Sequence, residues 1–412
     1  MPSRAVERSL APSRGSERGL DWFAFFLADI QTGFGPFVAV YLAALGWTQT
    51  SIGLVLTVGG LVALAGQMAG GALIDATRCH RLLAALAIGA IGISALALAV
   101  WPVFSIVMAS RILHAAASCV VGPAMLAISL GIVGHVAMGE RLGRNARFAS
   151  SGNCLTAAAM GVSGLLLSNQ SVFFFTAALV VPSLFALTRI RITDADGRQA
   201  HRVPPIRPRA TLATGIRILA GNRPLLIFAA CAVLFHLANA AMLPLMGAIV
   251  ATRSNEWATT LIAACTVVPQ LVVAGASPWV GRQAQCRGRR PLLLVCFAAL
   301  ALRGILFAVV ADPYLVVTVQ VLDGVSAAVL GVTFPLIVVD LTRHSGRFNL
   351  ALGVMGTAVG IGASLSTTIA GYVADHFGNS TAFVGFAGVA MAGLVLVWRL
   401  MPETRPGDQA PT

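Results

Sequence analysis

Residues 82–101 read LLAALAIGAIGISALALAVW, twenty residues without a charged side chain. A helix of this length rises about 30 Å, the thickness of the hydrocarbon core of a bilayer. The stretch is therefore expected to cross a membrane as a helix. The whole chain has the same character, because 57% of its 412 residues are hydrophobic and only 10% are charged. This composition excludes an ordinary soluble domain and leaves room for roughly a dozen crossings.

Apolar runs separated by glycine, proline or charge clusters predict twelve spans in all. They are expected at 20–45, 50–75, 82–101, 103–134, 147–168, 172–190, 224–250, 257–281, 291–310, 313–340, 348–374 and 380–400. The proline-rich piece 202–209 indicates an extended linker in the middle. The predicted organisation is an all-α membrane protein with an N-terminal tail (1–19), a six-helix bundle (20–190), a central loop (191–222), a second six-helix bundle (223–400) and a C-terminal tail (401–412).

The distribution of arginine predicts the orientation. All 28 basic residues are arginine, and the formal net charge is +13. The N-terminal tail, the loops after spans two, four, six, eight and ten, and the C-terminal end would share one side of the membrane. In that order they hold 4, 2, 3, 8, 4, 2 and 2 arginines, which is 25 of the 28. Positively charged loops stay cytoplasmic, so both termini are expected inside, with the chain in a bacterial inner membrane. Because these residues lie between apolar segments and not on one face, nucleic acid is not an expected partner.

The two halves share a sequence register, as in parallel repeats. Arg111-Ile-Leu-His114-Ala115 in the fourth span is followed by Gly122. Gln320-Val-Leu-Asp323-Gly324, followed by Gly331, lies 209 residues later in the tenth span. Similarly, Asp29 and Pro36 in the first span correspond to His236 and Pro244 in the seventh, at close to the same offset. This repetition indicates two related bundles.

The loop after the second span carries a recognisable pattern, Gly71-Ala-Leu73-Ile-Asp75-Ala-Thr-Arg78-Cys-His-Arg81. It resembles the loop signature of the major facilitator superfamily, in which glycine, leucine and aspartate are followed by basic residues. The equivalent loop of the second half keeps the basic end, with Gln285 at the acidic position. Arg111, His114 and Ala115 resemble the family's fourth-helix motif, with alanine in place of its glycine. The resemblance implies two bundles that alternate access to a cavity lined by helices one, four, seven and ten.

An aspartate at a helix end can accept from N–H groups at the N-terminus of a neighbouring helix and can pair with arginine, which makes a latch between the bundles. The alternative is a set of charges that only keep the loops inside. The candidate gating residues are Gly71, Asp75, Arg78, Arg81, Arg289 and Arg290.

Ionisable side chains at membrane depth cost free energy unless they are paired or face water, so each is a functional candidate. Asp29 or Asp323 is expected to carry a proton, and Arg111 to set its affinity. The alternative is a set of buried polar contacts between helices. Arg303 is expected to be a structural partner of a neighbouring helix. Further candidate residues of the cavity are His114, His236, Gln31, Asn239 and Gln320.

The expected function is secondary transport of a small organic solute, coupled to protons. Direct use of ATP is not expected, because the chain has no lysine for a phosphate-binding loop. No cofactor, no metal and no enzymatic activity are expected. The protein is expected to be a monomer. Export is slightly favoured because the expected cavity has few charges. Against it, the fifth span lacks the Gly-Pro pair that, by resemblance, marks many drug exporters. Uptake of a nutrient or siderophore and a non-transporting sensor are the alternatives.

Overall fold

The structure is a computed structural model, and it describes residues 13–32, 38, 41–42, 44–166, 170–191, 212–246, 258–310, 312–343 and 345–405. Within these residues the regular structure is helical, so the prediction of an all-α chain is confirmed. Ten helices of the described part are long and apolar enough to cross a membrane.

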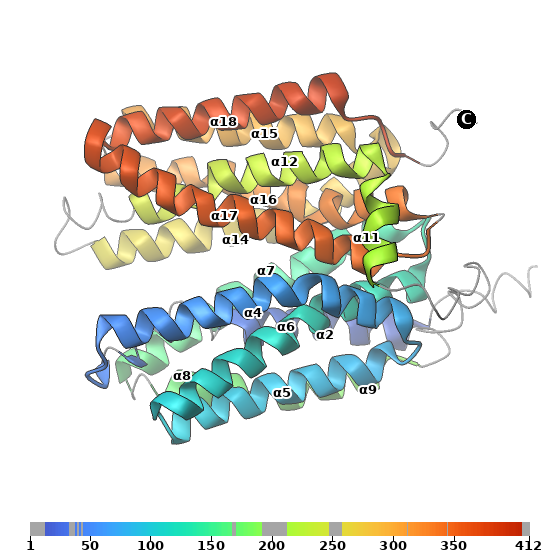
Figure 1. The fold of residues 1–412 in the computed structure, drawn as a ribbon, viewed down its shortest axis with the longest axis vertical. Coiled ribbons are helices and arrows are strands. Elements are labelled where there is room, and N and C mark those ends of the chain that lie inside the picture. Colours follow the sequence, from blue (N-terminus) through green and yellow to red (C-terminus); the bar gives the residue numbers. More distant parts are fainter. Residues whose placement is uncertain are drawn as a thin grey trace, which may run out of the picture.

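The helices form two bundles, which lie one above the other in Figure 1. The N-terminal half contains α2 (Arg14–Thr32), α4 (Gln49–Ala76), α5 (His80–Val100), α6 (Phe104–Val133), α7 (Met138–Leu166), α8 (Ser171–Ala178) and α9 (Val180–Thr188). The C-terminal half contains α12 (Arg223–Asn239), α14 (Ala258–Arg287), α15 (Arg290–Val309), α16 (Pro313–Thr342), α17 (Phe348–Phe377) and α18 (Asn379–Leu400). Each expected span overlaps one of these helices, except that two short helices, α8 and α9, share the sixth.

Several helices extend beyond the expected spans. The helix α7 begins at Met138, nine residues before the expected start at 147, and α14 ends at Arg287, six residues after the expected end at 281. Hydropathy reports only the part of a helix that lies in lipid, whereas backbone hydrogen bonds continue the helix through its polar ends. A further helix, α11 (Leu212–Ala220), lies within the expected central loop. The proline-rich piece 202–209 lies outside the described residues.

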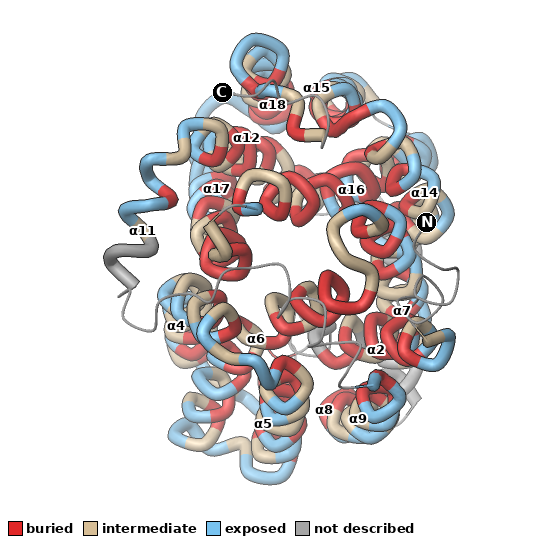
Figure 2. The backbone as a smooth tube through the Cα atoms, turned by 90° about the vertical axis from the view of Figure 1, so that its right-hand side faces the viewer, coloured by how far each residue is buried: buried red, intermediate tan, exposed pale blue. Residues whose placement is uncertain are grey.

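Each half packs around an apolar core of its own, and buried positions concentrate on the inward faces of the helices (Figure 2). Lipid tails are as apolar as leucine, so helices in a bilayer associate through close packing and polar contacts rather than through exclusion of water. Small residues allow this approach. A side chain at Gly393 of α18 would overlap the ring of Phe297 of α15, for example.

The C-terminal segment fastens one end of the C-terminal half. The Glu403 carboxylate accepts hydrogen bonds from the backbone N–H groups of Arg289 (2.8 Å) and Arg290 (3.1 Å), at the start of α15. Arg289 also donates through Nε to the Asp340 carboxylate of α16 at 2.9 Å, and Thr404 Oγ1 donates to the same oxygen at 3.3 Å. Glu403 therefore pairs N–H groups that a helix N-terminus leaves unpaired and places a negative charge at its positive end.

We expect Glu403→Ala to lower the thermal unfolding temperature of the purified protein. The substitution leaves two N–H groups of α15 without their carboxylate acceptor, which costs about 1 to 2 kcal/mol. Thermal unfolding in detergent, followed by intrinsic fluorescence, measures the change. Asp375→Ala is the control, because Asp375 is an exposed carboxylate that does not lie at a helix N-terminus. An equal effect of both substitutions would contradict this role for Glu403.

Candidate functional site

The first contact between the halves joins the end of α4 to the start of α17. The Asp75 carboxylate accepts hydrogen bonds from the Asn349 backbone N–H (3.1 Å), the Asn349 side-chain amide (2.8 Å) and the Leu350 backbone N–H (2.8 Å). A carboxylate at a helix N-terminus meets both unpaired N–H donors and the positive end of the helix dipole. We call this contact the Asp75 latch. It lies at the end of the molecule that carries the α4–α5 and α14–α15 turns, the arginine-rich end.

Glycine permits the close approach that the Asp75 latch needs. A side chain at Gly71 would overlap the backbone carbonyl of Asn349, and one at Gly353 would overlap the carbonyl of Gln67. Gly71, a candidate gating residue, is therefore placed directly against α17. The two helices touch along this segment because neither presents a side chain at these positions.

A second contact joins α7 to α14 at the same end. Gln285 donates through Nε2 to the backbone carbonyl of Val136 at 2.5 Å, just before α7 begins. We call this contact the Gln285 latch. Arg147 donates through Nε to the Ala274 carbonyl at 3.0 Å in the same interface. Met138 and Leu142 of α7 also belong to the apolar core of the C-terminal half.

The two latches are related by the internal repeat, but their chemistry is reversed. Asp75 accepts hydrogen bonds, whereas Gln285, at the equivalent position, donates one. In the sequence, Gln285 stands where the motif of the first half has its aspartate. The structure gives the amide a partner across the interface that an ionised carboxylate could not have, because a carboxylate has no hydrogen to donate to a carbonyl.

The remaining candidate gating residues bind within their own halves. Arg81 donates to the Ile190 carbonyl at 2.6 Å, Arg289 pairs with Asp340, and Arg290 donates to the Trp398 carbonyl. Arg78 is exposed. These contacts hold the loops against their bundles and do not cross the interface.

A buried polar cluster in the N-terminal half escaped the sequence interpretation. Asp21 of α2 binds Arg141 and Arg144 of α7, each at 2.5 Å, and both Asp21 and Arg141 are almost fully buried. Arg141 Nε donates to Asn145 at 2.8 Å, and Asn145 donates to Ser129 of α6 at 2.9 Å. In the sequence, Arg141 and Arg144 contribute only to the arginine distribution that predicts the orientation. The i, i+4 spacing of Arg141 and Asn145, which puts them on one helix face, was the available signal.

The C-terminal half contains an ion pair at membrane depth. Arg303 of α15 donates through Nη1 to the Asp323 carboxylate of α16 at 2.7 Å and to Asn239 Oδ1 of α12 at 2.6 Å. The Arg303 side chain is 1% exposed and that of Asp323 is 20% exposed. The Arg303 guanidinium also lies 5.1 Å from the centre of the Phe307 ring. Asp323 thus has Arg303, and not Arg111, as its partner in this conformation.

The other candidate residues are more scattered. In α6 the Arg111 guanidinium lies against Gly59 of α4, and His114 Nε2 lies 3.4 Å from Ser118 Oγ. In α12 the His236 ring packs edge-on against Phe235. Gln320 is fully buried in α16, three residues before Asp323. Asp29 and Gln31 fall in the last turn of α2, and their side chains lie outside the described residues.

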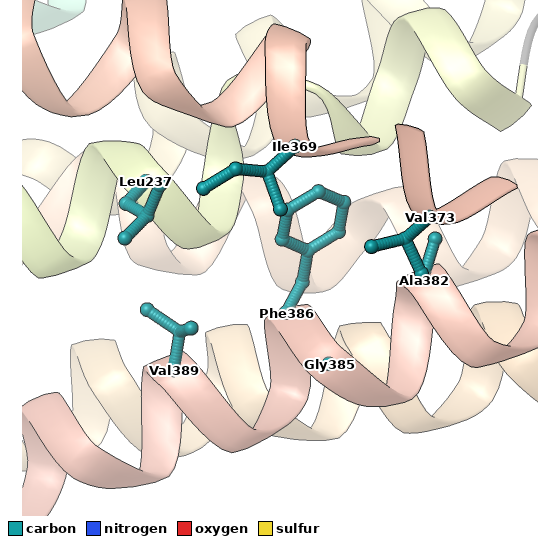
Figure 3. A pocket seen from close by; sticks show the side chains of 7 residues that line it. All are labelled: Leu237, Ile369, Val373, Ala382, Gly385, Phe386 and Val389. Carbon is teal, nitrogen blue, oxygen red and sulfur yellow. The ribbon is translucent and has the colours of Figure 1, made fainter. Parts of the chain in front are cut away.

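Two glycines at equivalent positions of the repeat helices border open space. A side chain added at Gly122 of α6 would meet no atom within 4 Å, and neither would one at Gly331 of α16, which stands 209 residues later. A separate groove between α12, α17 and α18 has entirely apolar walls (Figure 3), so it offers no group for chemistry or ion binding. Its lining residues are Leu237, Ile369, Val373, Ala382, Gly385, Phe386 and Val389.

Comparison with known proteins identifies the family. The sequence model of the Major Facilitator Superfamily (MFS) matches residues 22–253 and again 229–412. The chain therefore belongs to the major facilitator superfamily and is a multi-pass membrane transporter, not an enzyme. A protein of Mycobacterium tuberculosis, described in two strains as an uncharacterized MFS-type transporter, is 39% identical over 399 residues, covering 95% of this chain and 94% of the relative.

Two solved structures share the fold. The proton:xylose symporter XylE, bound to 6-bromo-6-deoxy-D-glucose, has a TM-score of 0.71 and 15% identity, and the match covers 95% of both chains. The nucleoside transporter NupG has a TM-score of 0.64 and 17% identity over 94% of this chain and 100% of NupG. At these identities the likeness shows the fold alone, and it confirms the predicted arrangement of two six-helix bundles.

We expect Asp75→Asn to open the arginine-rich end. An amide has one acceptor oxygen for three donors, and the loss of charge-assisted hydrogen bonds costs about 2 kcal/mol, roughly a thirtyfold change in the ratio of closed to open molecules. Electron-spin distance measurements between labels at Ala76→Cys and Arg343→Cys, with Cys79 and Cys286 replaced by serine, report the change. Asp375→Asn, an exposed site at the other end of α17, should leave the distances unchanged. Unchanged distances in Asp75→Asn as well would refute the latch.

We expect Gln285→Glu to make the second contact dependent on pH. An ionised glutamate is only an acceptor and repels the Val136 carbonyl, so α7 and α14 separate at neutral pH. A protonated glutamate donates, so the contact returns as the pH falls toward the ordinary glutamate pKa of about 4.3. The same spin-label measurement, between α7 and α14, tests the change. A distance that is the same at pH 7.5 and pH 4.5 in both Gln285→Glu and the parent would show that the amide donor is unimportant.

Proposed function

We propose that this transporter exports a small, weakly charged organic solute in exchange for protons, by alternating access between its two halves. The observation that carries the proposal is the Arg303–Asp323 pair, in which a fully buried guanidinium faces a carboxylate that retains partial exposure. Asp323 stands about 15 Å along α16 from its first residue, well inside the span. A charge at that depth needs a partner or a water-filled path.

The pair is suited to coupling because protonation of Asp323 removes the counter-charge of Arg303. Breaking an ion pair in a medium of low dielectric constant leaves an uncompensated charge, so a proton at Asp323 favours a rearrangement around Arg303. Arg303 is held at the same time by Asn239 of α12. A change at Asp323 therefore acts on α12, α15 and α16 together. Asp29, on α2 of the first half, is the second candidate proton carrier.

The helix α12 provides a physical route from this pair to the Asp75 latch. The backbone N–H that follows α12, at Ala241, donates to Ser366 Oγ of α17 at 3.0 Å, and Gly362 lets α17 approach the Val233 carbonyl. The helix α17 carries Asn349 and Leu350 at its other end. We infer that a shift of α12 that follows proton binding moves α17 and releases Asp75. The two latches would then open and close the arginine-rich end.

The direction of transport follows from the chemistry around the pair. Away from their ends, where Asp21 and Asp340 lie, the helices expected to line the cavity carry few charges: Asp29, Arg111, His114, His236 and Asp323. Such a lining favours an amphipathic solute, which suits export, over a sugar that needs many hydrogen bonds. The arginine distribution supports cytoplasmic termini in a bacterial inner membrane, and a monomer suffices for the mechanism.

We expect Asp323→Asn to reduce solute flux driven by a pH gradient at least tenfold. Solute exchange without a gradient should persist. The amide cannot take up a proton, but it leaves Arg303 without its counter-ion, so the double variant Arg303→Gln with Asp323→Asn serves as a charge-balanced form. A thermal-stabilisation screen of the purified protein supplies the probe solute, because a ligand at about 100 times its Kd adds about 2.7 kcal/mol. Flux of this solute is then measured in proteoliposomes.

Asp375→Asn is the control, since that exposed aspartate should not affect coupling. Full gradient-driven flux in both Asp323→Asn and Asp29→Asn would exclude proton coupling through either carboxylate. The sign of the pH gradient that drives accumulation tells export from uptake of a nutrient or siderophore. A solute that binds but is never moved by the parent protein would favour the sensor.

A further inference from the structure

The helix α11 differs in placement from every membrane-spanning helix of the described part. It runs across the ends of α12 and α17 instead of along them, at the arginine-rich end (Figure 1). Seen from that end, it lies at the periphery of the bundle beside α12 and α17 (Figure 2). A break at Gly221 and Asn222 separates it from α12, where Asn222 caps α12 by accepting from the Leu225 N–H at 3.1 Å. It therefore lies at the level where the bilayer meets water.

The sequence of α11 cannot sustain a helix alone. Nine residues are too few for a stable helix in water, and Gly215 inside it costs roughly another 1 kcal/mol relative to alanine. The surrounding surface must supply the difference. Within the described side chains, Leu219 is 3% exposed and packs in the core of the C-terminal half. Leu219 therefore packs one face of α11 against the protein, and the other faces of the helix do not share this contact.

The outward side of α11 is amphipathic. Successive residues turn by about 100°, so Ile218 and Arg217 point to directions different from that of Leu219. Ile218 is 48% exposed and Arg217 is exposed as well. Just beyond the break, Arg223 is exposed and Leu226, on α12, is 49% exposed. Leu226 belongs to the apolar surface that α12 presents to lipid, so Ile218 extends that surface to its edge, with two arginines alongside.

We propose that α11 is an interfacial helix that binds the headgroups of anionic phospholipids. Ile218 enters the boundary between headgroups and acyl chains, and Arg217 and Arg223 bind the phosphates. Arginine presents a planar fork of donors that matches phosphate oxygens, and the negative surface of an anionic leaflet attracts basic residues placed beside a membrane. An exposed apolar residue with cations beside it, here Arg217 on α11 and Arg223 at the start of α12, is the combination by which helices lie on a bilayer surface.

Hydrogen exchange of the 212–220 amides tests the proposal in nanodiscs that hold one copy of the full chain. We expect these amides to exchange several-fold more slowly in discs that contain phosphatidylglycerol than in discs of phosphatidylcholine, and the difference should shrink in 1 M salt, where the screening length falls to about 3 Å. Arg217→Gln should remove the difference between the two lipids. Arg282→Gln, which removes an exposed arginine of α14 at the same end, should preserve it.

Ile218→Ser should raise the exchange rate of α11 in both lipids, because it removes the apolar contact. Three outcomes would overturn the proposal. The first is equal exchange of α11 in the two lipids, and the second is an equal effect of Arg217→Gln and Arg282→Gln. The third is protection that arises only in discs holding two copies, which would assign the surface to a second copy of the chain. Transport is not measured in this experiment, so a wrong assignment of proton coupling would leave its result intact.

Discussion

The Asp75 carboxylate carries the constraint on which the conformation of this transporter depends. The N–H groups at the start of a helix have no acceptor within the helix itself, so they must find partners elsewhere. For α17 that partner comes from the other half of the molecule, through the Asn349 and Leu350 N–H groups. Separation of the halves at this end would therefore leave these N–H groups in need of another acceptor, such as water. In this conformation the contact between the halves and the cap of α17 are the same interaction.

The asymmetry of the two latches follows from the same constraint. The interface at α4 and α17 presents N–H donors and selects a carboxylate, whereas the interface at α7 and α14 presents the Val136 carbonyl and selects an amide. A carboxylate in each position would leave one of them facing a carbonyl oxygen. The internal repeat thus preserves the position of the contact while the chemistry follows the backbone group on the opposite side.

The fold was largely predictable from the sequence, since the membrane makes hydropathy a strong signal for each crossing. The extensions of α7 and α14 and the presence of α11 have one cause, because these helical segments lie in the polar layer, where hydropathy gives no signal. The contact of Asp75 with a helix N-terminus was also predictable, because an aspartate at a helix end needs donors. The partners of Arg303 and Asp21 were not. Their pairing depends on which helices lie side by side. Neither the contact of Arg303 with Asn239 nor that of Asp21 with Arg141 has a sequence spacing that reveals it.

In the proposed mechanism, the two buried ion pairs have different roles. Asp21 is shared by Arg141 and Arg144, so the loss of one arginine leaves it a second partner, and the cluster lies at the arginine-rich end beside the Gln285 latch. Asp323 has a single arginine, keeps a fifth of its side chain exposed, and lies deep in the span. A carboxylate held by two arginines keeps a partner when one contact breaks, whereas a carboxylate held by one arginine loses its only counter-charge. The first arrangement fixes α2 against α7, and the second leaves α15 and α16 free to respond.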